Sequence, residues 1–193
     1  MMVFMLAITV ILALACGLFY QQTSGLIREQ LRERLMMTAG IIASNLDADA
    51  HERIRSDADP EYKQIKEKLI RMRDVSPSIR VIYTMKAAKG PQWHFIVDTE
   101  PPDSEIYSAY GDPYNILQHP AMAAGIKGLS ASKTLLPDEY GVWLSGYAPI
   151  RDKDGVAHSI VGVDMSAQEV LAKEAAMLRI ILGVFGVGLV VAF

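Results

Sequence analysis

Polar and aromatic side chains alternate with aliphatic ones along residues 142–148. Because successive side chains of a β-strand point to opposite faces, a strand here carries Trp143, Ser145 and Tyr147 on one face. Its other face carries aliphatic and small residues, Val142, Leu144, Gly146 and Ala148. An aliphatic face suits a helix packed against it, whereas two aromatic rings, a hydroxyl and a phenol suit a partly wet cavity. The pattern therefore predicts a small-molecule site on the aromatic face.

Nucleophilic or metal-dependent chemistry has weaker support. A nucleophile elbow around Ser145 would need glycine where Trp143 stands. The histidines are far apart in the sequence, without a close pair at metal-ligand spacing: His51, His94, His119 and His158. A cluster of acids could hold calcium but lacks the loop pattern of a calcium hand: Asp98, Glu100, Asp103 and Glu105. We expect no catalytic residue, metal or cofactor here, and a metal-dependent extracytoplasmic enzyme is the least favoured alternative.

Two predicted hairpins position the aromatic face. Strands over about residues 142–150 and 156–165 flank a turn at residues 151–155 that contains an Asp–Gly pair. Strands over 79–86 and 92–98 flank Lys89, Gly90 and Pro91. In this second hairpin Val81, Tyr83 and Met85 alternate with Arg80, Ile82 and Thr84, and Trp93, Phe95 and Val97 alternate with His94, Ile96 and Asp98.

Helices are expected around these strands. Residues 21–56 contain no proline and predict one long helix, and a second helix runs from about Pro60 to before Pro77. A short helix is expected over 116–125 and a further strand over 133–136. Residues 99–114 form a loop rich in proline, acid and tyrosine, and a loop of this length is typical of a functional segment. The order predicts an α+β domain with an antiparallel sheet.

Both ends of the chain are apolar. Residues 1–20 have about the length needed to cross a bilayer and lack the basic n-region of a signal peptide. A cleaved signal peptide, or a lipoprotein signal ending at Cys16, is the alternative. We expect a transmembrane helix at 1–20, a middle domain at 21–175 and the start of a second transmembrane helix at 176–193, where the sequence is cut inside the span.

Two spans place both termini on one side of the membrane and the middle domain on the other. Arg28, Arg32 and Arg34 favour an inside location for that domain, but long translocated domains largely ignore this charge bias. We expect the domain outside, from the architecture. The net charge of −3 argues against nucleic acid as a partner.

The long N-terminal helix has a broad apolar stripe. Coiled-coil-like spacing relates Leu31, Leu35, Thr38, Ile42 and Asn45, and Met37, Ile41 and Leu46 widen the stripe. We expect its later half to pack on the sheet. Its earlier half, with Leu31 and Leu35, has no evident apolar partner except another chain, which predicts a parallel homodimer.

Five segments carry a family resemblance. IRVIYTMK, WHFIVDTEPPD, GDPYN, EYGVWLSGYAPI and IVGVDMS occur in this order and together resemble the single-unit, PAS-like Cache sensor domains of bacterial and archaeal transmembrane receptors. The likeness covers about residues 21–166. It implies a periplasmic small-molecule sensor in the inner (plasma) membrane, joined through the second span to a cytoplasmic output module. Histidine kinases, diguanylate cyclases and methyl-accepting chemoreceptors are built this way, so kinase or cyclase activity would belong to the missing module.

Within such domains the ligand lies between the sheet and the loops that cover it. The resemblance implies seven lining residues, with Arg80 as a weaker candidate: Tyr83, Asp98, Tyr114, Trp143, Ser145, Tyr147 and Asp164. The aromatic–arginine–aspartate pattern of the double-unit domains that sense amino acids is not evident, so the ligand stays open.

Each of these candidates also has a structural interpretation. Trp143 and Tyr147 can be core aromatics, Asp98 and Asp164 can accept hydrogen bonds from backbone amides at strand ends, and Arg80 can be solvated. The alternative function is that of a membrane-anchored adaptor whose middle domain binds a protein partner.

Overall fold

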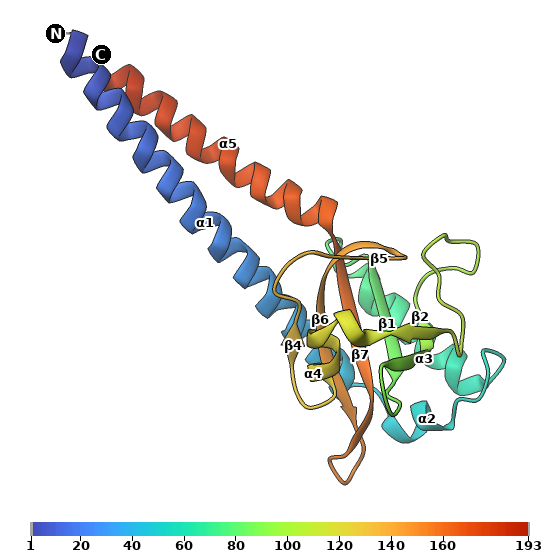
Figure 1. Cartoon of the computed structure of the whole chain (residues 1–193). Coiled ribbons are helices and arrows are strands. Elements are labelled where there is room, and N and C mark those ends of the chain that lie inside the picture. Colours follow the sequence, from blue (N-terminus) through green and yellow to red (C-terminus); the bar gives the residue numbers. More distant parts are fainter. Residues whose placement is uncertain (1, 193) are drawn as a thin grey trace. The chain divides into compact units, whose positions relative to one another are not determined.

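A computed structural model describes the backbone of residues 2–192 and the side chains of residues 9–11 and 13–188. Figure 1 shows its elements in chain order. The chain divides into two compact units. One is Arg32–Ala167, which holds all the strands found among the described residues, and the other consists of the chain on either side of it.

The larger unit is built on a seven-stranded sheet with the order β3-β2-β1-β7-β6-β4, in which β5 also pairs with β6. Every strand pair is antiparallel. The strands are β1 Val81–Lys86, β2 Gln92–Asp98, β3 Pro113–Asn115, β4 Ser130–Ala131, β5 Leu136–Asp138, β6 Gly141–Arg151 and β7 Ala157–Ser166. The α+β class and both predicted hairpins are confirmed. The predicted strand at 133–136 is wrong, because β4 ends before that segment and β5 begins at its last residue.

The helices are α1 Met2–Ser44, α2 Ala48–Arg53, α3 Pro60–Asp74, the 3-10 helix η1 Ile116–Gln118, α4 Pro120–Gly125 and α5 Ala167–Ala192. The prediction of one helix as far as residue 56 is wrong. The Ser44 hydroxyl and the Asn45 amide both donate to the carbonyl of Ile41, at 2.9 and 2.8 Å. Asp47 then caps α2 by accepting from Ala50 N at 2.9 Å. Such bonds from side chains to nearby backbone compete with continued helix.

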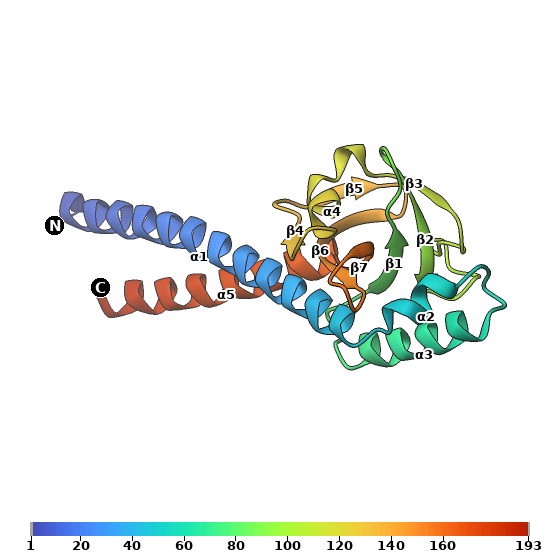
Figure 2. The same cartoon turned by 90° about the horizontal axis from the view of Figure 1, so that it is seen from below.

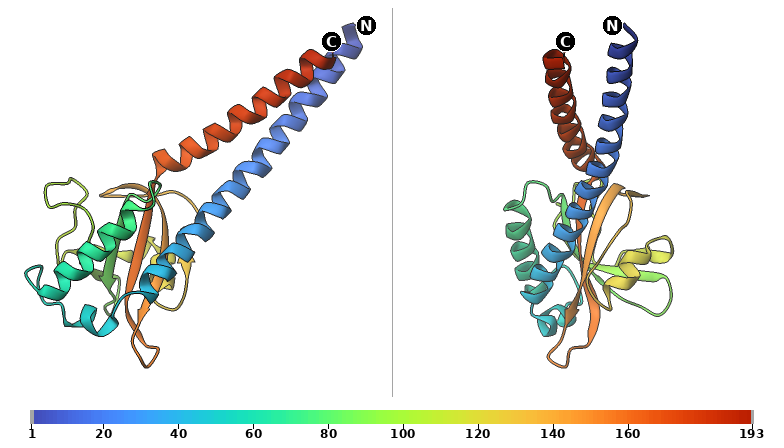
Figure 3. Two further views of the ribbon diagram at one scale, coloured as in Figure 1. Left: turned by 180° about the vertical axis from the view of Figure 1, so that it is seen from behind. Right: turned by 90° about the vertical axis from the view of Figure 1, so that its left-hand side faces the viewer.

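Different elements cover the two faces of the sheet. Figures 2 and 3 show the later part of α1 together with α3 on one face and α4 on the other. A Cβ atom at Gly146 would lie 2.5 Å from the carbonyl carbon of Leu35, so the backbone of α1 approaches β6 where no side chain intervenes. The aliphatic face of β6 therefore packs on a helix, as predicted. The opposite face carries an aromatic core that includes Tyr83, Phe95, Tyr114, Trp143 and Tyr147.

Part of the apolar stripe of α1 is buried within its own chain. Leu35 is 1% exposed and Leu31 is also buried, so the expectation that these leucines lack an apolar partner in their own chain is wrong. Met37 and Ile41 are the exposed apolar residues of this part of α1, at 62% and 60% exposure. A homodimer remains a prediction, and these two residues become the candidates for its interface.

The smaller unit contains the first part of α1 and nearly all of α5. The Arg28 guanidinium of α1 forms an ion pair with the Glu174 carboxylate of α5, with Nη2 3.1 Å from Oε2. Among the described residues, one helix segment is long and apolar enough to cross a membrane, Thr9–Ser44 of α1. The predicted second span is helical as far as Ala192, and its last side chains lie outside the described residues, so it remains a prediction.

Candidate ligand site

A small cavity of about 30 Å³ lies on the aromatic face of the sheet. Strands β1, β2, β6 and β7 supply its floor, and Ile106 and Ser108 come from the loop between β2 and β3. Its lining consists of Val81, Tyr83, Phe95, Asp98, Ile106, Ser108, Tyr114, Asp138, Tyr140, Trp143 and Asp164. The loop predicted to be functional thus covers the face predicted to bind.

Strand register explains how the floor is assembled. Tyr83 of β1 and Tyr147 of β6 both lie opposite Gly162 of β7. A Cβ atom at Gly162 would lie 2.3 Å from Cζ of Tyr83, so the Tyr83 ring lies across a position that has no side chain. Two residues further along β7, Asp164 lies between Val81 and Ser145 on the same face.

A β-bulge brings Asp98 to the cavity. Met85 lies opposite Phe95, whereas Thr84 lies opposite Val97, so β2 has one extra residue at this point. Phe95 and Asp98 therefore share a face although they are three residues apart. The Asp98 carboxylate accepts from Glu100 N at 2.6 Å and from Ser108 N at 3.1 Å. Burial raises the pKa of Asp98 to about 6, against the opposite effect of these two amides.

Asp138 at the end of β5 forms a second carboxylate centre. It accepts from the Tyr114 hydroxyl at 2.8 Å, from Trp143 Nε1 at 3.2 Å and from Tyr140 N at 2.9 Å. The Tyr114 hydroxyl is also 3.0 Å from Nε2 of His119. Asp138 therefore fixes three aromatic residues of the lining through hydrogen bonds.

Asp164 is the third carboxyl of the lining, and its environment differs from that of the other two. Its side chain is buried, at 8% exposure, and Oδ1 has no hydrogen-bond partner among the described residues. Ser145 of β6 lies directly opposite Asp164 in the strand register and favours its ionised form, and Tyr147 lies near both Ser145 and Tyr83. Burial is the main reason that the pKa of Asp164 is raised to about 8. A buried acceptor without a donor is costly for the fold and is available to a ligand.

The predicted site residues fall into three groups. Five of them line the cavity: Tyr83, Asp98, Tyr114, Trp143 and Asp164. Ser145 and Tyr147 do not line it, but both lie on β6 beside β7, where Ser145 is directly opposite Asp164. The side chain of Arg80 lies outside the lining, with Nη2 3.0 Å from Oε2 of Glu100. Trp143 and Tyr147 also belong to the aromatic core, so their structural interpretation holds as well.

Sequence reasoning missed several lining residues, of which Asp138 makes the most hydrogen bonds. The predicted strand at 133–136 stopped two residues before it, and an aspartate that follows a proline in a connection is too common to be selected. Ile106 and Ser108 were implied only through the loop that contains them. Phe95 and Val81 were predicted on strand faces but not assigned to a site.

The covering loop is fastened at its start by Glu100. This carboxylate is 1% exposed and lies 3.0 Å from Arg80 Nη2 and 3.6 Å from Arg73 Nη1. It also accepts from the Ser104 hydroxyl at 2.7 Å, while Lys66 Nζ donates to the Glu100 carbonyl at 2.9 Å. Glu100, the most buried member of the acidic cluster considered as a calcium site, is therefore paired with two arginines. Among the described residues, no group of three or more His, Cys, Asp or Glu side chains is arranged to hold a metal ion.

Comparison with known proteins places this geometry in context. No protein-family model matches the sequence, and no curated protein sequence matches it. Solved structures do match in fold. The ligand-binding domain of Campylobacter jejuni chemoreceptor Tlp3 in complex with L-norvaline has a TM-score of 0.54 at 12% identity, covering 81% of this chain and 59% of that one. The fold is that of a chemoreceptor ligand-binding domain.

Two further structures agree. The Tlp3 domain in complex with L-valine has a TM-score of 0.53 at 11% identity and covers 81% of this chain and 60% of that one. The ligand-binding domain of the Pseudomonas aeruginosa amino acid chemoreceptor PctC in complex with GABA has a TM-score of 0.50 at 18% identity, covering 82% and 65%. All three are ligand-binding domains of chemoreceptors. The match spans less than two thirds of each of those chains.

Proposed function

We propose that the middle domain, residues 21–175, is the small-molecule input domain of a transmembrane receptor. The observation that carries this proposal is the cavity on the aromatic sheet face, which contains a buried carboxyl oxygen without a donor among the described residues. A cavity with an apolar lining and a few converging polar groups is the usual form of a ligand site. The chemoreceptor domains of the same fold were solved with L-valine, L-norvaline and GABA, which supports a small-molecule ligand here.

The proposal includes a location and an assembly. The apolar part of α1 anchors the chain in the inner membrane, the middle domain lies in the periplasm, and α5 leads to an output module. Such a module is a histidine kinase, a diguanylate cyclase or a chemoreceptor signalling region. The receptor functions as a homodimer, for which the exposed Met37 and Ile41 of α1 are the supporting observation.

The connection between site and output is short along the chain. Asp164 lies in β7, which ends at Ser166, and α5 begins at Ala167. A ligand that binds Asp164 therefore acts on the strand that continues directly into the exit helix. A shift of β7 on binding is the simplest way for the cavity to signal through α5.

A ligand screen tests the proposed function. The full 193-residue chain in detergent micelles is heated with small metabolites of every charge type, because binding to the folded state raises Tm. Ile106→Trp fills the cavity from the covering loop and should abolish any rise, whereas Leu117→Trp, at an exposed position, should preserve it. If no compound of any charge raises Tm, or if Ile106→Trp leaves the rise unchanged, the cavity is not the ligand site.

A further inference from the structure

A histidine is buried on the face of the sheet that points away from the candidate ligand cavity. His51 belongs to α2 and is 3% exposed, and its Nε2 lies 2.8 Å from Oγ1 of Thr84 in β1. Thr84 lies on this face because its neighbours Tyr83 and Met85 both belong to the aromatic core. The other ring nitrogen of His51, Nδ1, is buried and has no hydrogen-bond partner among the described residues. The imidazole therefore fixes α2 to the sheet through one of its two nitrogens.

This arrangement suits a neutral imidazole. Each tautomer of neutral histidine carries one N–H, whereas the imidazolium ion carries two. The Thr84 hydroxyl oxygen can accept from Nε2, but an N–H at Nδ1 would be buried without an acceptor among the described residues. Burial accordingly lowers the pKa of His51 to about 4. Protonation of His51 in its buried position is therefore costly for either tautomer.

Charged groups face His51 from several elements. Glu52 of α2 favours its protonated form, and Lys86 of β1 opposes that form. These two side chains form an ion pair with 2.5 Å between Nζ and Oε2. Toward α3, Arg53 pairs with Glu61 at 3.3 Å. Both carboxylates are thus engaged with partners other than His51.

A second cavity, of about 60 Å³, lies beside the imidazole. Its titratable lining residues besides His51 are Asp49 and Glu52 of α2, Asp152 of the β6–β7 turn and His158 of β7. A cavity of this volume has room for water, which gives protons a path from solvent. Because three of these four groups are carboxyls, the cavity attracts an imidazolium ion that leaves Thr84.

Thr84 connects His51 with the opposite face of the sheet. Its hydroxyl oxygen also accepts from Val97 N at 3.2 Å. Val97 lies at the β-bulge that brings Asp98 to the candidate ligand cavity. One oxygen atom therefore holds both α2 and the bulged part of β2.

We propose that His51 is an acid-sensitive anchor: protonation by solvent moves its imidazole from Thr84 into the acidic cavity, releases α2 from the sheet and loosens the bulge beside Asp98. α2 is suited to such movement, because it has only six residues and its own N-cap at Asp47. The switch works without a ligand, so its test is independent of the proposed function.

The pH range of the switch follows from the two states of His51. Released His51 titrates near the ordinary pKa of 6.5, whereas anchored His51 stays neutral until about pH 4. The released state therefore binds more protons between these values. Stability of the anchored state is complete above about pH 6.5 and is lost as pH falls toward 4. Between pH 7 and pH 5 the equilibrium should shift toward release by roughly 20-fold.

Hydrogen–deuterium exchange on the full chain in detergent micelles measures the release, after correction for the intrinsic pH dependence of amide exchange. We expect the protection of residues 51–54 to fall roughly 20-fold from pH 7 to pH 5, and that of Val97 to fall with it. Residues 160–165 of β7 should keep their protection, because the opening is local. Constant protection of residues 51–54 in the wild type over this range overturns the inference. So does an equal loss at residues 160–165, which would indicate global acid unfolding.

Two variants assign the effect to His51. His51→Gln keeps a hydrogen-bonding side chain opposite Thr84 but cannot titrate, so its protection at residues 51–54 should not fall with pH. His158→Gln, at an exposed position that lines the same cavity, should retain the wild-type fall. An equal fall in His51→Gln and wild type overturns the inference. Release of residues 51–54 with unchanged protection at Val97 overturns its coupling to the bulge.

Discussion

At the residue scale, Asp164 is a carboxyl in unfavourable surroundings. It is buried in the sheet, one oxygen has no partner among the described residues, and its pKa lies near 8 instead of 3.8. Groups that a fold stabilises poorly are frequently those it uses, because a binding site is kept at a cost in stability. The stability of the protein should therefore depend on the ionisation of this one carboxyl.

The first prediction concerns the pH dependence of that cost. Because the pKa of Asp164 is raised in the folded state, stability is highest below the unfolded value of 3.8 and is lost as pH rises to about 8. Asp164→Asn removes this dependence. We expect the variant to gain stability relative to wild type as pH increases from 4 to 8, by roughly 2 to 4 kcal/mol over that range.

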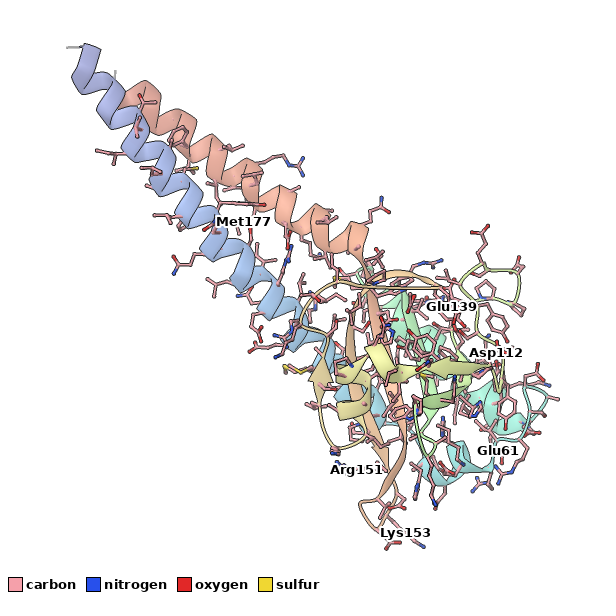
Figure 4. The ribbon with its side chains drawn as sticks, in the orientation of Figure 1. Glu61, Asp112, Glu139, Arg151, Lys153 and Met177 are labelled. Carbon is pink, nitrogen blue, oxygen red and sulfur yellow. The ribbon has the colours of Figure 1, made fainter. Side chains whose placement is uncertain are left out.

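Thermal unfolding of the full chain at four pH values measures the gain. Asp154→Asn is the control, because its carboxylate lies in an exposed turn. Figure 4 shows the neighbouring Lys153 at the tip of that turn and Glu139 toward the other end of the hairpin. A constant difference between Asp164→Asn and wild type across the pH range would contradict the prediction.

The second prediction separates the ring of Tyr147 from its hydroxyl. The ring is buried against Gly125, where a Cβ atom would lie 2.6 Å from Cβ of Tyr147, and the hydroxyl interacts with Tyr83 and Ser145. Tyr147→Ala should cost about 3 to 5 kcal/mol, as large aromatic truncations do. Tyr147→Phe should cost about 1 kcal/mol and leave the fold intact.

Chemical denaturation measures both values. Equal destabilisation by Tyr147→Phe and Tyr147→Ala would contradict this separation of the ring from the hydroxyl.

Sequence patterns predicted the residues of the site only where strand alternation was regular. Trp143 and Tyr83 follow from period-two alternation in β6 and β1. The position of Asp98 beside Phe95 depends on the bulge in β2, and no residue type in that strand marks where the extra residue falls. The role of Asp138 depends on β5, a three-residue strand that is too short to carry a periodic signal.

At the element scale, α1 and β6 pack closely at Gly146. Position 146 needs glycine because the atoms nearest to an added Cβ belong to the backbone of α1: the carbonyl carbon of Leu35 at 2.5 Å and the nitrogen of Met36 at 2.7 Å. Flexible side chains can move away from an added methyl group, but a helix backbone moves only as a unit.

The third prediction follows from this contact. Gly146→Ala should destabilise the protein by about 1 to 3 kcal/mol or more, because α1 must move away from the sheet. Gly128→Ala is the matched control, since no atom lies within 4 Å of a Cβ atom there. Denaturation midpoints of the two variants measure the difference. Equal midpoints would show that α1 adjusts to the added methyl group without cost.

The boundaries of elements were harder to predict than their existence. The apolar stripe of the N-terminal helix was visible in the sequence, but its end at Ser44 depends on hydrogen bonds from Ser44 and Asn45 to one carbonyl, that of Ile41. The stripe also could not indicate its partner. Leu31 and Leu35 have the spacing of a coiled coil, and the same spacing serves a helix that packs within its own chain.

At the scale of the whole molecule, the exposed side of α1 bears on assembly. Met37 and Ile41 are four residues apart, lie on one helix face and are mostly exposed, whereas Leu35 is buried. The fourth prediction is that cysteines at Met37 or Ile41, in a Cys16→Ser background, form disulfide cross-links in native membranes. Leu35→Cys should not. Cross-linking at Leu35 alone, or at none of the three positions, would count against a dimer through this face.

The last prediction concerns the side of the membrane on which the middle domain lies. The β6–β7 turn is exposed and separated along the chain from both α1 and α5, so a cysteine there reports the location of the domain without disturbing either helix. Lys153→Cys in the Cys16→Ser background should react with a membrane-impermeant maleimide in intact cells whose outer membrane is permeable to the reagent. Ile160→Cys, at a buried position in the same hairpin, should react only after denaturation. This variant is the control for unfolded protein in the sample. Labelling of Lys153→Cys only after the inner membrane is disrupted would place the domain in the cytoplasm, where its cavity would be exposed to cytoplasmic and not to external small molecules.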